Sequence, residues 1–170
     1  MITKKLLGTI LILVLFLEMP ALMRAQDASK ADNDFPVKGF HIDLRIQVMT
    51  PEALKDFAKQ LSEFGMNTLV MEWEGTYPFE KHPTISNKYS YSREEVEDFI
   101  AYCEGLGIKV VPLQQSLGHV EYILRNSRYS ELKEDRKDIS QLCPMESEAS
   151  KALFTDLFAD LAKTHNSDYV

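Results

Sequence analysis

Residues 50–72, TPEALKDFAKQLSEFGMNTLVME, decide the fold, because residues 92–114, SREEVEDFIAYCEGLGIKVVPLQ, repeat their pattern 42 positions later. Each stretch begins with a hydroxyl residue suited to cap a helix, continues with apolar residues at helical spacing, and closes with a glycine followed by an apolar run. The matching apolar positions are Leu54, Phe57, Ala58, Leu61 and Phe64 in the first stretch, and Val96, Phe99, Ile100, Cys103 and Leu106 in the second. Two such units in tandem predict an α/β fold with a parallel sheet.

The expected elements alternate along the chain. Strands are predicted at residues 38–44, 67–72 and 108–113, helices at 51–64, 93–106 and 150–164, and the start of a fourth strand at 167–170. Pro51 at the first helical position and a capping box formed by Ser92 and Glu95 fix two of the helix starts. A complete (β/α)8 barrel needs about 250 residues. We therefore expect residues 36–170 to form the N-terminal half of a TIM barrel, with a small doubly wound sheet as the alternative.

Residues 1–25 have the pattern of a secretory signal peptide. Two lysines precede an apolar stretch at residues 6–17, and small residues follow near Ala25. The apolar stretch is too short to cross a bilayer, so we expect an exported protein, periplasmic or extracellular, without stable membrane insertion after cleavage. An uncleaved membrane anchor is the alternative. Residues 26–35 are polar and are predicted to form a disordered tether.

Composition limits the class of protein. An apolar fraction of 45% and a charged fraction of 26% are typical of a globular domain. The net charge of −7 argues against nucleic acid as a partner. The two cysteines are Cys103, on the apolar face of a predicted helix, and Cys143, in a predicted loop. We expect no disulfide framework.

Polar residues occupy alternate positions at the end of the first predicted strand. In parallel α/β folds, the chemistry collects where strands lead into helices. His41, Asp43 and Arg45 alternate and therefore share one face of the strand. One interpretation is a structural Asp–Arg pair. The other is substrate contact, because a guanidinium presents several donors to sugar hydroxyls.

The second predicted strand ends in two carboxylates. Glu72 and Glu74 flank Trp73 and point the same way, which raises their proton affinity if both are buried. The loop that follows is rich in aromatic residues, namely Tyr77, Phe79, Tyr89 and Tyr91. Aromatic faces suit the C–H face of a pyranose ring, so Trp73 and Tyr77 are candidate substrate contacts. Simple packing of the loop is the alternative.

The third predicted strand leads into a long connection, residues 114–149, that contains His119 directly after a glycine. Loops of this length in compact domains are usually functional or disordered. A histidine at a strand end can orient a group, relay a proton or bind a metal, although a lone histidine is more often a satisfied structural group. With acidic residues expected at the same edge, a divalent metal site is a second hypothesis. Its candidate ligands are Asp43, Glu72, Glu74, His119 and Glu121.

Four stretches of the chain resemble the catalytic domain of family 20 glycoside hydrolases, with the hexosaminidase D type as the nearest likeness. They are residues 39–45 (GFHIDLR), 72–80 (EWEGTYPFE), 88–95 (KYSYSREE) and 111–121 (VPLQQSLGHVE). The resemblance covers nearly all of residues 37–170. It implies a (β/α)8 barrel that removes terminal β-linked N-acetylhexosamine and uses the acetamido oxygen of the substrate as the nucleophile.

The resemblance also implies roles for single residues. His119 matches a histidine that relays between the acid and a carboxylate of the second strand, and Glu74 matches that carboxylate. Arg45 matches the basic residue that holds the outer sugar hydroxyls, with Asp43 beside it. Gly75 stands where relatives of this type often carry an acid, so sugar contacts there are expected to differ. No metal and no cofactor are implied.

The catalytic pair of this family, an adjacent Asp and Glu, follows the fourth strand. The sequence ends with Asp168, Tyr169 and Val170, so the pair is expected beyond Val170 and is not among these residues. We therefore expect a fragment of an exo-β-N-acetylhexosaminidase that is inactive by itself and whose partner is a glycan with a terminal N-acetylhexosamine. The alternatives are a non-catalytic carbohydrate-binding remnant and a metal-dependent barrel enzyme.

Overall fold

The computed structural model describes residues 35–169, in which the chain from Val37 onward forms one compact unit. The predicted signal peptide at residues 1–25 lies outside the described residues, as does all but the last residue of the predicted tether at 26–35. Within the described part of the chain, no helix combines the length and the apolar character needed to cross a membrane.

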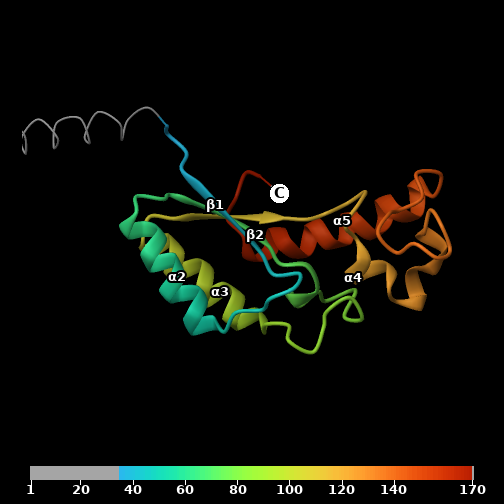
Figure 1. Ribbon diagram of the computed structural model, residues 1–170, viewed down its shortest axis with the longest axis horizontal. Helices are drawn as coiled ribbons and strands as arrows, with labels where there is room; N and C mark the ends of the chain where they lie inside the picture. Colours follow the sequence, from blue (N-terminus) through green and yellow to red (C-terminus); the bar gives the residue numbers. More distant parts are fainter. Residues whose placement is uncertain (1–34, 170) are drawn as a thin grey trace, which may run out of the picture. The chain divides into compact units, whose positions relative to one another are not determined.

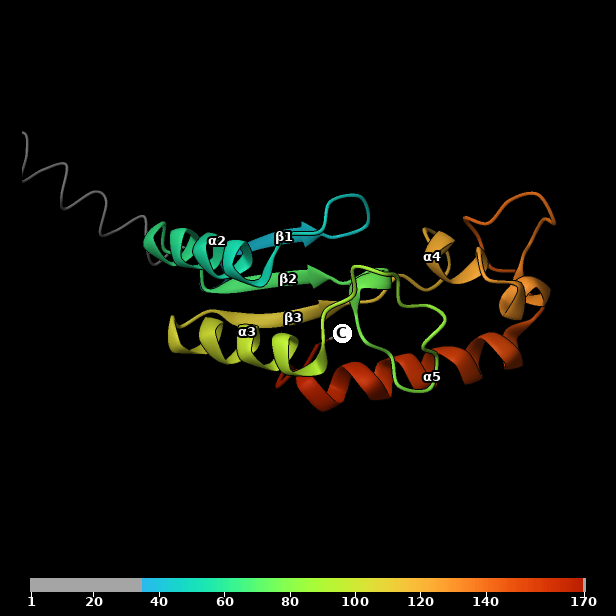
Figure 2. The same ribbon diagram turned by 90° about the horizontal axis from the view of Figure 1, so that it is seen from below.

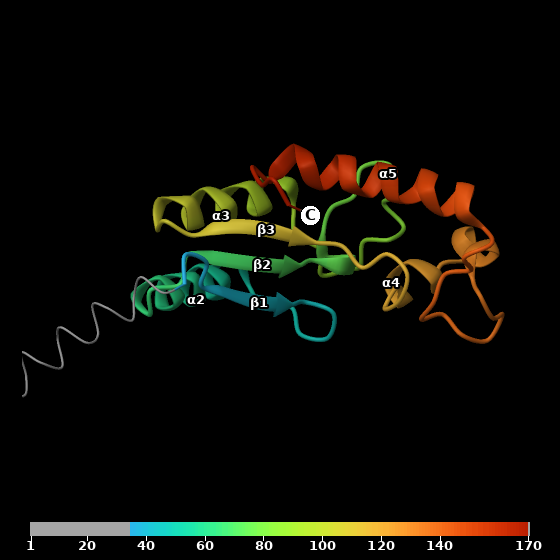
Figure 3. The ribbon, with the colours of Figure 1, turned by 90° about the horizontal axis from the view of Figure 1, so that it is seen from above.

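Three parallel strands form the sheet, in the order β1 (Gly39–Asp43), β2 (Thr68–Glu72) and β3 (Lys109–Leu113). All three point the same way, toward the end of the unit that carries α4 (Figures 2 and 3). The register places Asp43 opposite Glu72 and Glu72 opposite Leu113. The predicted α/β class with parallel strands is confirmed, and the level register brings the three strand ends to one edge.

Two helices cover one face of the sheet, α2 (Pro51–Glu63) and α3 (Arg93–Gly105) (Figure 1). Their starts are set by caps. Thr50 Oγ1 accepts a hydrogen bond from the Ala53 N–H at 3.2 Å, and Ser92 and Glu95 exchange the two bonds of a capping box at 3.1 and 2.7 Å. These bonds satisfy N–H groups that have no partner within the helix.

Glycines close both helices and turn the chain back toward the sheet. Gly65 and Gly107 have φ angles of 77° and 76°, a region that a side chain disfavours. Most members of the two apolar faces that follow from the repeat are buried, but Phe64 is 77% exposed, and Phe57 and Leu106 are only partly buried. The buried members include Leu54, Ala58, Leu61, Val96, Phe99, Ile100 and Cys103, together with Leu69, Ile108 and Val110 of the strand segments.

The connections contain short elements that the sequence pattern did not predict: η1 (Glu74–Thr76), α4 (Glu121–Leu124) and η2 (Ser127–Leu132). The last helix, α5 (Ser147–Thr164), starts earlier than expected, and its C-terminal end lies next to α3 while the rest extends past it (Figures 2 and 3).

The start of a fourth strand, predicted at 167–170, is wrong for its described residues, 167–169, which form no strand. There the Tyr169 N–H donates to Ser167 Oγ at 3.1 Å, a local bond that competes with pairing in a sheet. Val170, the last residue of that predicted strand, lies outside the described residues. The prediction therefore fails where it can be compared with the structure, and the part that falls on Val170 stays a prediction.

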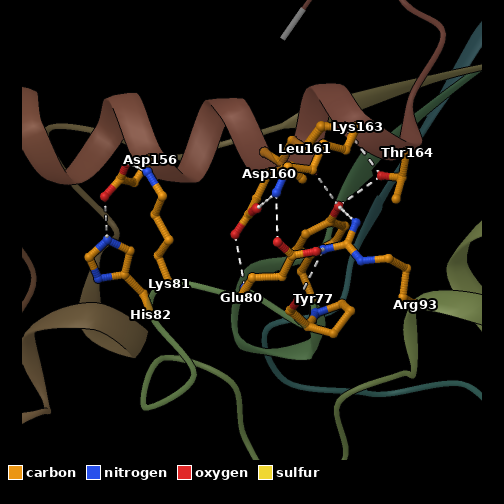
Figure 4. Close-up of polar contacts among 11 residues, drawn as sticks. Tyr77, Glu80, Lys81, His82, Arg93, Asp156, Asp160, Leu161, Lys163 and Thr164 are labelled. Atoms are coloured by element: carbon orange, nitrogen blue, oxygen red, sulfur yellow. Dashed lines mark hydrogen bonds and ion pairs between the residues drawn. The ribbon is translucent and has the colours of Figure 1, made fainter.

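A polar seam joins the loop after β2 to α5 (Figure 4). The Tyr77 hydroxyl donates to the Asp160 carbonyl oxygen at 2.8 Å and lies 2.8 Å from the Thr164 hydroxyl. The Glu80 N–H donates to the Asp160 carboxylate at 2.9 Å, and Lys163 bridges the carboxylates of Glu80 and Asp160 at 2.6 and 3.0 Å. These bonds hold the loop that follows β2 against α5.

Replacing Ser92 by alanine should lower the free energy of unfolding by about 1 kcal/mol, because the Glu95 N–H at the start of α3 loses its acceptor. The measurement is urea unfolding followed by circular dichroism. Ser130→Ala is the matched control, since Ser130 is exposed and its hydroxyl caps nothing in the described structure. Equal effects of the two substitutions would contradict this role of the capping box.

Removing the buried hydroxyl of Tyr77 should also destabilise the unit. Tyr77→Phe deletes the bond to the Asp160 carbonyl and should lower the free energy of unfolding by roughly 1–2 kcal/mol. Tyr89→Phe serves as the control, because the Tyr89 side chain is 61% exposed. The seam would be energetically unimportant if both variants unfolded at the same urea concentration as the parent protein.

Candidate active site

Three carboxylates meet where β1 and β2 end. Oxygen atoms of Asp43, Glu72 and Glu74 all lie within 4.8 Å of one another. Glu72 is 1% exposed and Glu74 is 5% exposed, whereas Asp43 faces solvent. The register explains the meeting, since Asp43 and Glu72 are paired final residues of neighbouring strands. Like charges this close repel strongly in a buried setting, so the cluster requires a compensating cation or protons.

Arg45 supplies that positive charge. Its Nη2 lies 2.9 Å from Asp43 Oδ2 and 3.6 Å from Glu72 Oε1, and its Nε lies 3.5 Å from Glu74 Oε1. The hydrogen bond with Asp43 raises the pKa of Arg45. Burial acts to raise the pKa of Asp43, but hydrogen bonds from the Arg45 backbone and side chain outweigh it and hold that pKa below its ordinary value. The Asp–Arg pair of the first interpretation is thus present in the structure, and contact of these two residues with substrate stays a prediction.

Of the three carboxylates, Glu74 is the one whose negative charge the Arg45 guanidinium stabilises least. Burial, followed by repulsion from Glu72 and Asp43, raises the pKa of Glu74 to about 8 despite the attraction of Arg45. Its Oε1 is buried and accepts no hydrogen bond within the described structure. Near neutral pH, Glu74 therefore holds a proton that it can exchange, which is the property of a group suited to acid–base work.

Glu72, in contrast, is well satisfied. His41 Nε2 lies 2.9 Å from Glu72 Oε2, and Gln115 Nε2 donates to Glu72 Oε1 at 2.9 Å. An ionised carboxylate can only accept, so His41 donates through Nε2. The sequence pattern singled out His41 at the end of the first strand, but it did not mark Gln115 as a site residue. The signal for Gln115 was its position just after β3, at the edge where the strand ends meet.

His119 joins the cluster from the loop after β3. Arg45 Nη1 lies 3.1 Å from His119 Nδ1, and because a guanidinium only donates, Nδ1 accepts. The proton of the neutral ring is then on Nε2, which is left free to serve another group. Glu74 and His119 are the only non-glycine residues in the described chain with positive φ, at 49° and 57°. Such backbone strain is typical of functional sites.

The predicted relay is only partly assembled. His119 and Glu74 both contact Arg45, but no hydrogen bond joins the two side chains directly in the part of the chain that the structure describes. The guanidinium lies between them. A relay through these residues therefore stays a prediction, whereas the meeting of the three side chains at one edge is a finding. The acid and the orienting Asp, expected beyond Val170, likewise lie outside the described residues.

Trp73 and Tyr77 do not lie where a sugar could reach them, and this corrects the expectation that they contact substrate. Their side chains are 1% and 0% exposed. The Trp73 indole N–H donates to His165 Nε2 at 3.0 Å, and burial lowers the pKa of His165 to about 4, so its ring accepts this bond in the neutral form. Both rings belong to the core under α5, and of the four aromatic residues in the loop only Tyr89 is largely exposed.

The three carboxylates could in principle hold a divalent cation. Arg45 already contacts each of them and supplies a positive charge at their centre. A metal ion ligated by the three would have to displace this guanidinium. The observed arrangement thus favours a guanidinium-centred site over the alternative of a metal site.

Acids, a guanidinium and an imidazole thus meet at the carboxyl ends of parallel strands, the end at which barrel folds carry their functional residues. Comparison with known proteins makes this specific. The chain is 29% identical to human hexosaminidase D over 117 residues, which span 68% of this chain and 24% of the relative. No protein-family model matches the chain.

Solved structures show the same fold. A family 20 β-N-acetylhexosaminidase from Streptomyces coelicolor A3(2) aligns with a TM-score of 0.68 and 16% identity, over 79% of this chain and 32% of that one. A mutant β-hexosaminidase from Streptomyces plicatus, solved in complex with the product GlcNAc, aligns with a TM-score of 0.67 and 15% identity, over 79% and 31%. The described residues share the α/β fold of part of the barrel in these family 20 structures. The chain spans about a quarter to a third of the length of these proteins.

Glu74→Gln should change how stability depends on pH. A carboxyl whose pKa is raised on folding stabilises the folded state at low pH, and this contribution is lost as pH rises from its ordinary value of 4.5 through about 8. Glutamine cannot ionise. The variant should therefore gain stability relative to the parent protein as pH increases, with the largest difference above pH 8.

The measurement is the midpoint of urea unfolding between pH 5 and pH 9. Glu131→Gln is the control, because Glu131 is an exposed residue of η2. A constant difference between the Glu74 variant and the parent protein across this range would show that Glu74 does not titrate as the geometry requires.

Proposed function

We propose that this chain is part of an exo-β-N-acetylhexosaminidase of glycoside hydrolase family 20. The observation that supports the proposal most is the Arg45 guanidinium, which gathers Asp43, Glu72, Glu74 and His119 at the strand ends of a domain related to hexosaminidase D. The complex of the Streptomyces plicatus enzyme with GlcNAc supports a terminal N-acetylhexosamine as the substrate class.

The proposed reaction is substrate-assisted hydrolysis with retention. The acetamido oxygen of the substrate bonds to the anomeric carbon while the glycosidic C–O bond breaks, and an acid gives its proton to the leaving oxygen. Water then attacks the anomeric carbon, the bond between that carbon and the acetamido oxygen breaks to restore the acetamido group, and the same residue, now a base, accepts a proton from the water. We place the orienting Asp and the acid/base Glu after Val170, in a following strand of the barrel.

The residues of this chain would prepare the site for that step. Arg45 and Asp43 would hold the outer hydroxyls of the sugar, because the guanidinium retains donors beyond those used by Asp43 and His119. The N–H at His119 Nε2 would donate a hydrogen bond to the acid/base Glu and would so stabilise the ionised form of that residue after it has protonated the leaving oxygen. Glu74 holds a proton near neutral pH. It would release or take up that proton, and so change the net charge next to Arg45, when the acid/base Glu gains or loses its own proton.

The test is turnover of an aryl N-acetyl-β-glucosaminide. The full-length protein should hydrolyse it, and EDTA should not reduce the rate, whereas the 170-residue chain alone should show no turnover. Turnover by that chain would contradict the placement of the acid pair after Val170. Binding of N-acetylglucosamine by the full-length protein without hydrolysis would indicate a carbohydrate-binding protein instead, and inactivation by EDTA would indicate a metal-dependent enzyme.

Within the full-length protein, His119→Ala should lower kcat by roughly tenfold to a hundredfold and change KM much less, because a residue that supports the acid acts on the transition state. Leu117→Ala is the control in the same loop, since the Leu117 side chain is 74% exposed. An unchanged kcat, or a loss confined to KM, would contradict the role proposed for His119.

A further inference from the structure

A buried histidine lies outside the candidate active site, at the C-terminal end of α5. His165 directly follows the last residue of that helix and is 6% exposed. Its Nδ1 lies 3.0 Å from the Leu161 carbonyl oxygen and 2.9 Å from the Thr164 hydroxyl, and its Nε2 lies 3.0 Å from the Trp73 indole nitrogen. A carbonyl only accepts and an indole only donates. Both contacts are therefore satisfied by a single form of the ring, which is neutral and has its proton on Nδ1.

The indole at the other end of this bond belongs to the residue between the two buried acids. Trp73 follows Glu72 and precedes Glu74. The Trp73 carbonyl oxygen also accepts from the Thr76 N–H at 2.9 Å. Glu74 has a φ of 49°, a conformation that a side chain disfavours and that persists only where the surroundings impose it. An indole fixed at the preceding residue supplies such a restraint.

The indole depends on His165 for its hydrogen bond. Trp73 is buried and packs against the rings of Tyr77, Tyr91 and Phe99. The N–H is the one polar group of this side chain, and its acceptor among the described residues is His165. A buried donor that loses its acceptor is costly. We therefore expect the indole, and the residues beside it in the chain, to move when His165 cannot accept.

The charged groups on the elements around His165 pair with one another. These pairs are Lys163 with Asp160 and with Glu80, Arg93 with Glu80, and Lys109 with Asp168, at N–O distances between 2.6 and 3.2 Å. The Tyr77 ring, 6.3 Å from that of His165, stays neutral because burial raises the pKa of its hydroxyl. The hydrogen-bond partners of the His165 ring among the described residues are all uncharged.

These surroundings favour the neutral ring. Burial lowers the pKa of His165 to about 4, although the hydrogen bond with the Leu161 carbonyl acts to raise it. Protonation would place an N–H at Nε2, directly opposite the indole N–H. Two donors cannot share a hydrogen bond, so the protonated ring cannot hold Trp73 in its observed place.

We propose that His165 is a positioning residue, whose neutral ring holds the Trp73 indole and thereby keeps Glu74 buried beside Arg45. Removing or protonating the ring frees the indole, and Glu74 moves toward solvent. The importance of this for turnover rests on the proposed function, in which Glu74 exchanges its proton next to Arg45. The contact itself does not depend on that function.

The test replaces His165 in the full-length protein by leucine, which cannot accept, and by glutamine, whose amide oxygen accepts but does not titrate. The pKa of Glu74 is read from its ¹³C carboxyl resonance, assigned by its absence in Glu74→Gln. Burial is the main cause of the raised pKa of Glu74, about 8, so His165→Leu should lower it toward 4.5, whereas His165→Gln should preserve it.

His82→Gln is the matched control and should leave the pKa of Glu74 unchanged. His82 is also buried, but it contacts Asp156 of α5, 3.3 Å away, rather than the indole (Figure 4).

The second readout is the indole N–H resonance of Trp73, assigned by its absence in Trp73→Phe. In the parent protein it should shift with a midpoint near pH 4, as His165 takes up a proton, and in His165→Gln it should stay constant. A constant resonance in the parent protein would overturn the proposal. This titration needs no substitution at His165, so it tests the contact even if His165→Leu does not fold.

Turnover of the aryl glycoside is measured in parallel. His165→Leu should lower kcat about tenfold with a smaller change in KM, and His165→Gln should restore kcat. A Glu74 pKa that His165→Leu leaves unchanged would overturn the positioning role, and turnover by the parent protein would then leave the proposed function standing. A lowered Glu74 pKa in a protein without turnover supports the positioning role and rejects the proposed function.

Discussion

The charge of one guanidinium holds the candidate site together. The strand register places Asp43 and Glu72 side by side, and Glu74 follows two residues later, so three acids share a space in which they cannot all be ionised without a cation. Arg45 contacts each of them and also His119. The loops after β1, β2 and β3 are thus connected through a single side chain. The positive charge of Arg45 does not offset the burial of Glu74 and its repulsion by the other two acids, so the pKa of Glu74 is raised.

The parts of the fold that depend on local chemistry could be predicted from the sequence. The helix starts at Pro51 and Arg93 follow from hydroxyl caps, and the helix ends follow from glycines that adopt positive φ. Parallel pairing follows from repeated units, and it places the strand ends at one edge. The acids and Arg45 could be assigned to the site for that reason, because alternate positions on a strand end share a face whatever surrounds them.

The parts that depend on distant segments could not. Whether Trp73 and Tyr77 face a ligand or the core is decided by α5 and the residue after it, because Asp160 and His165 supply the partners for their polar atoms. An aromatic ring with a polar edge suits a sugar and a helix terminus equally well, and the sequence does not distinguish them. Short elements such as α4 carry too few residues for a periodic signal, so the sequence placed Glu121 near the strand ends but did not predict the helix that carries it.

The indole of Trp73 has a consequence for how such a domain changes during evolution. Trp73 lies between Glu72 and Glu74 in the chain, and its N–H is bound to His165 just after the last turn of α5. The direction in which the two acids point is therefore set partly from the outer layer of helices. A substitution at that helix end therefore acts on the orientation of the two acids from a distance, through the indole between them.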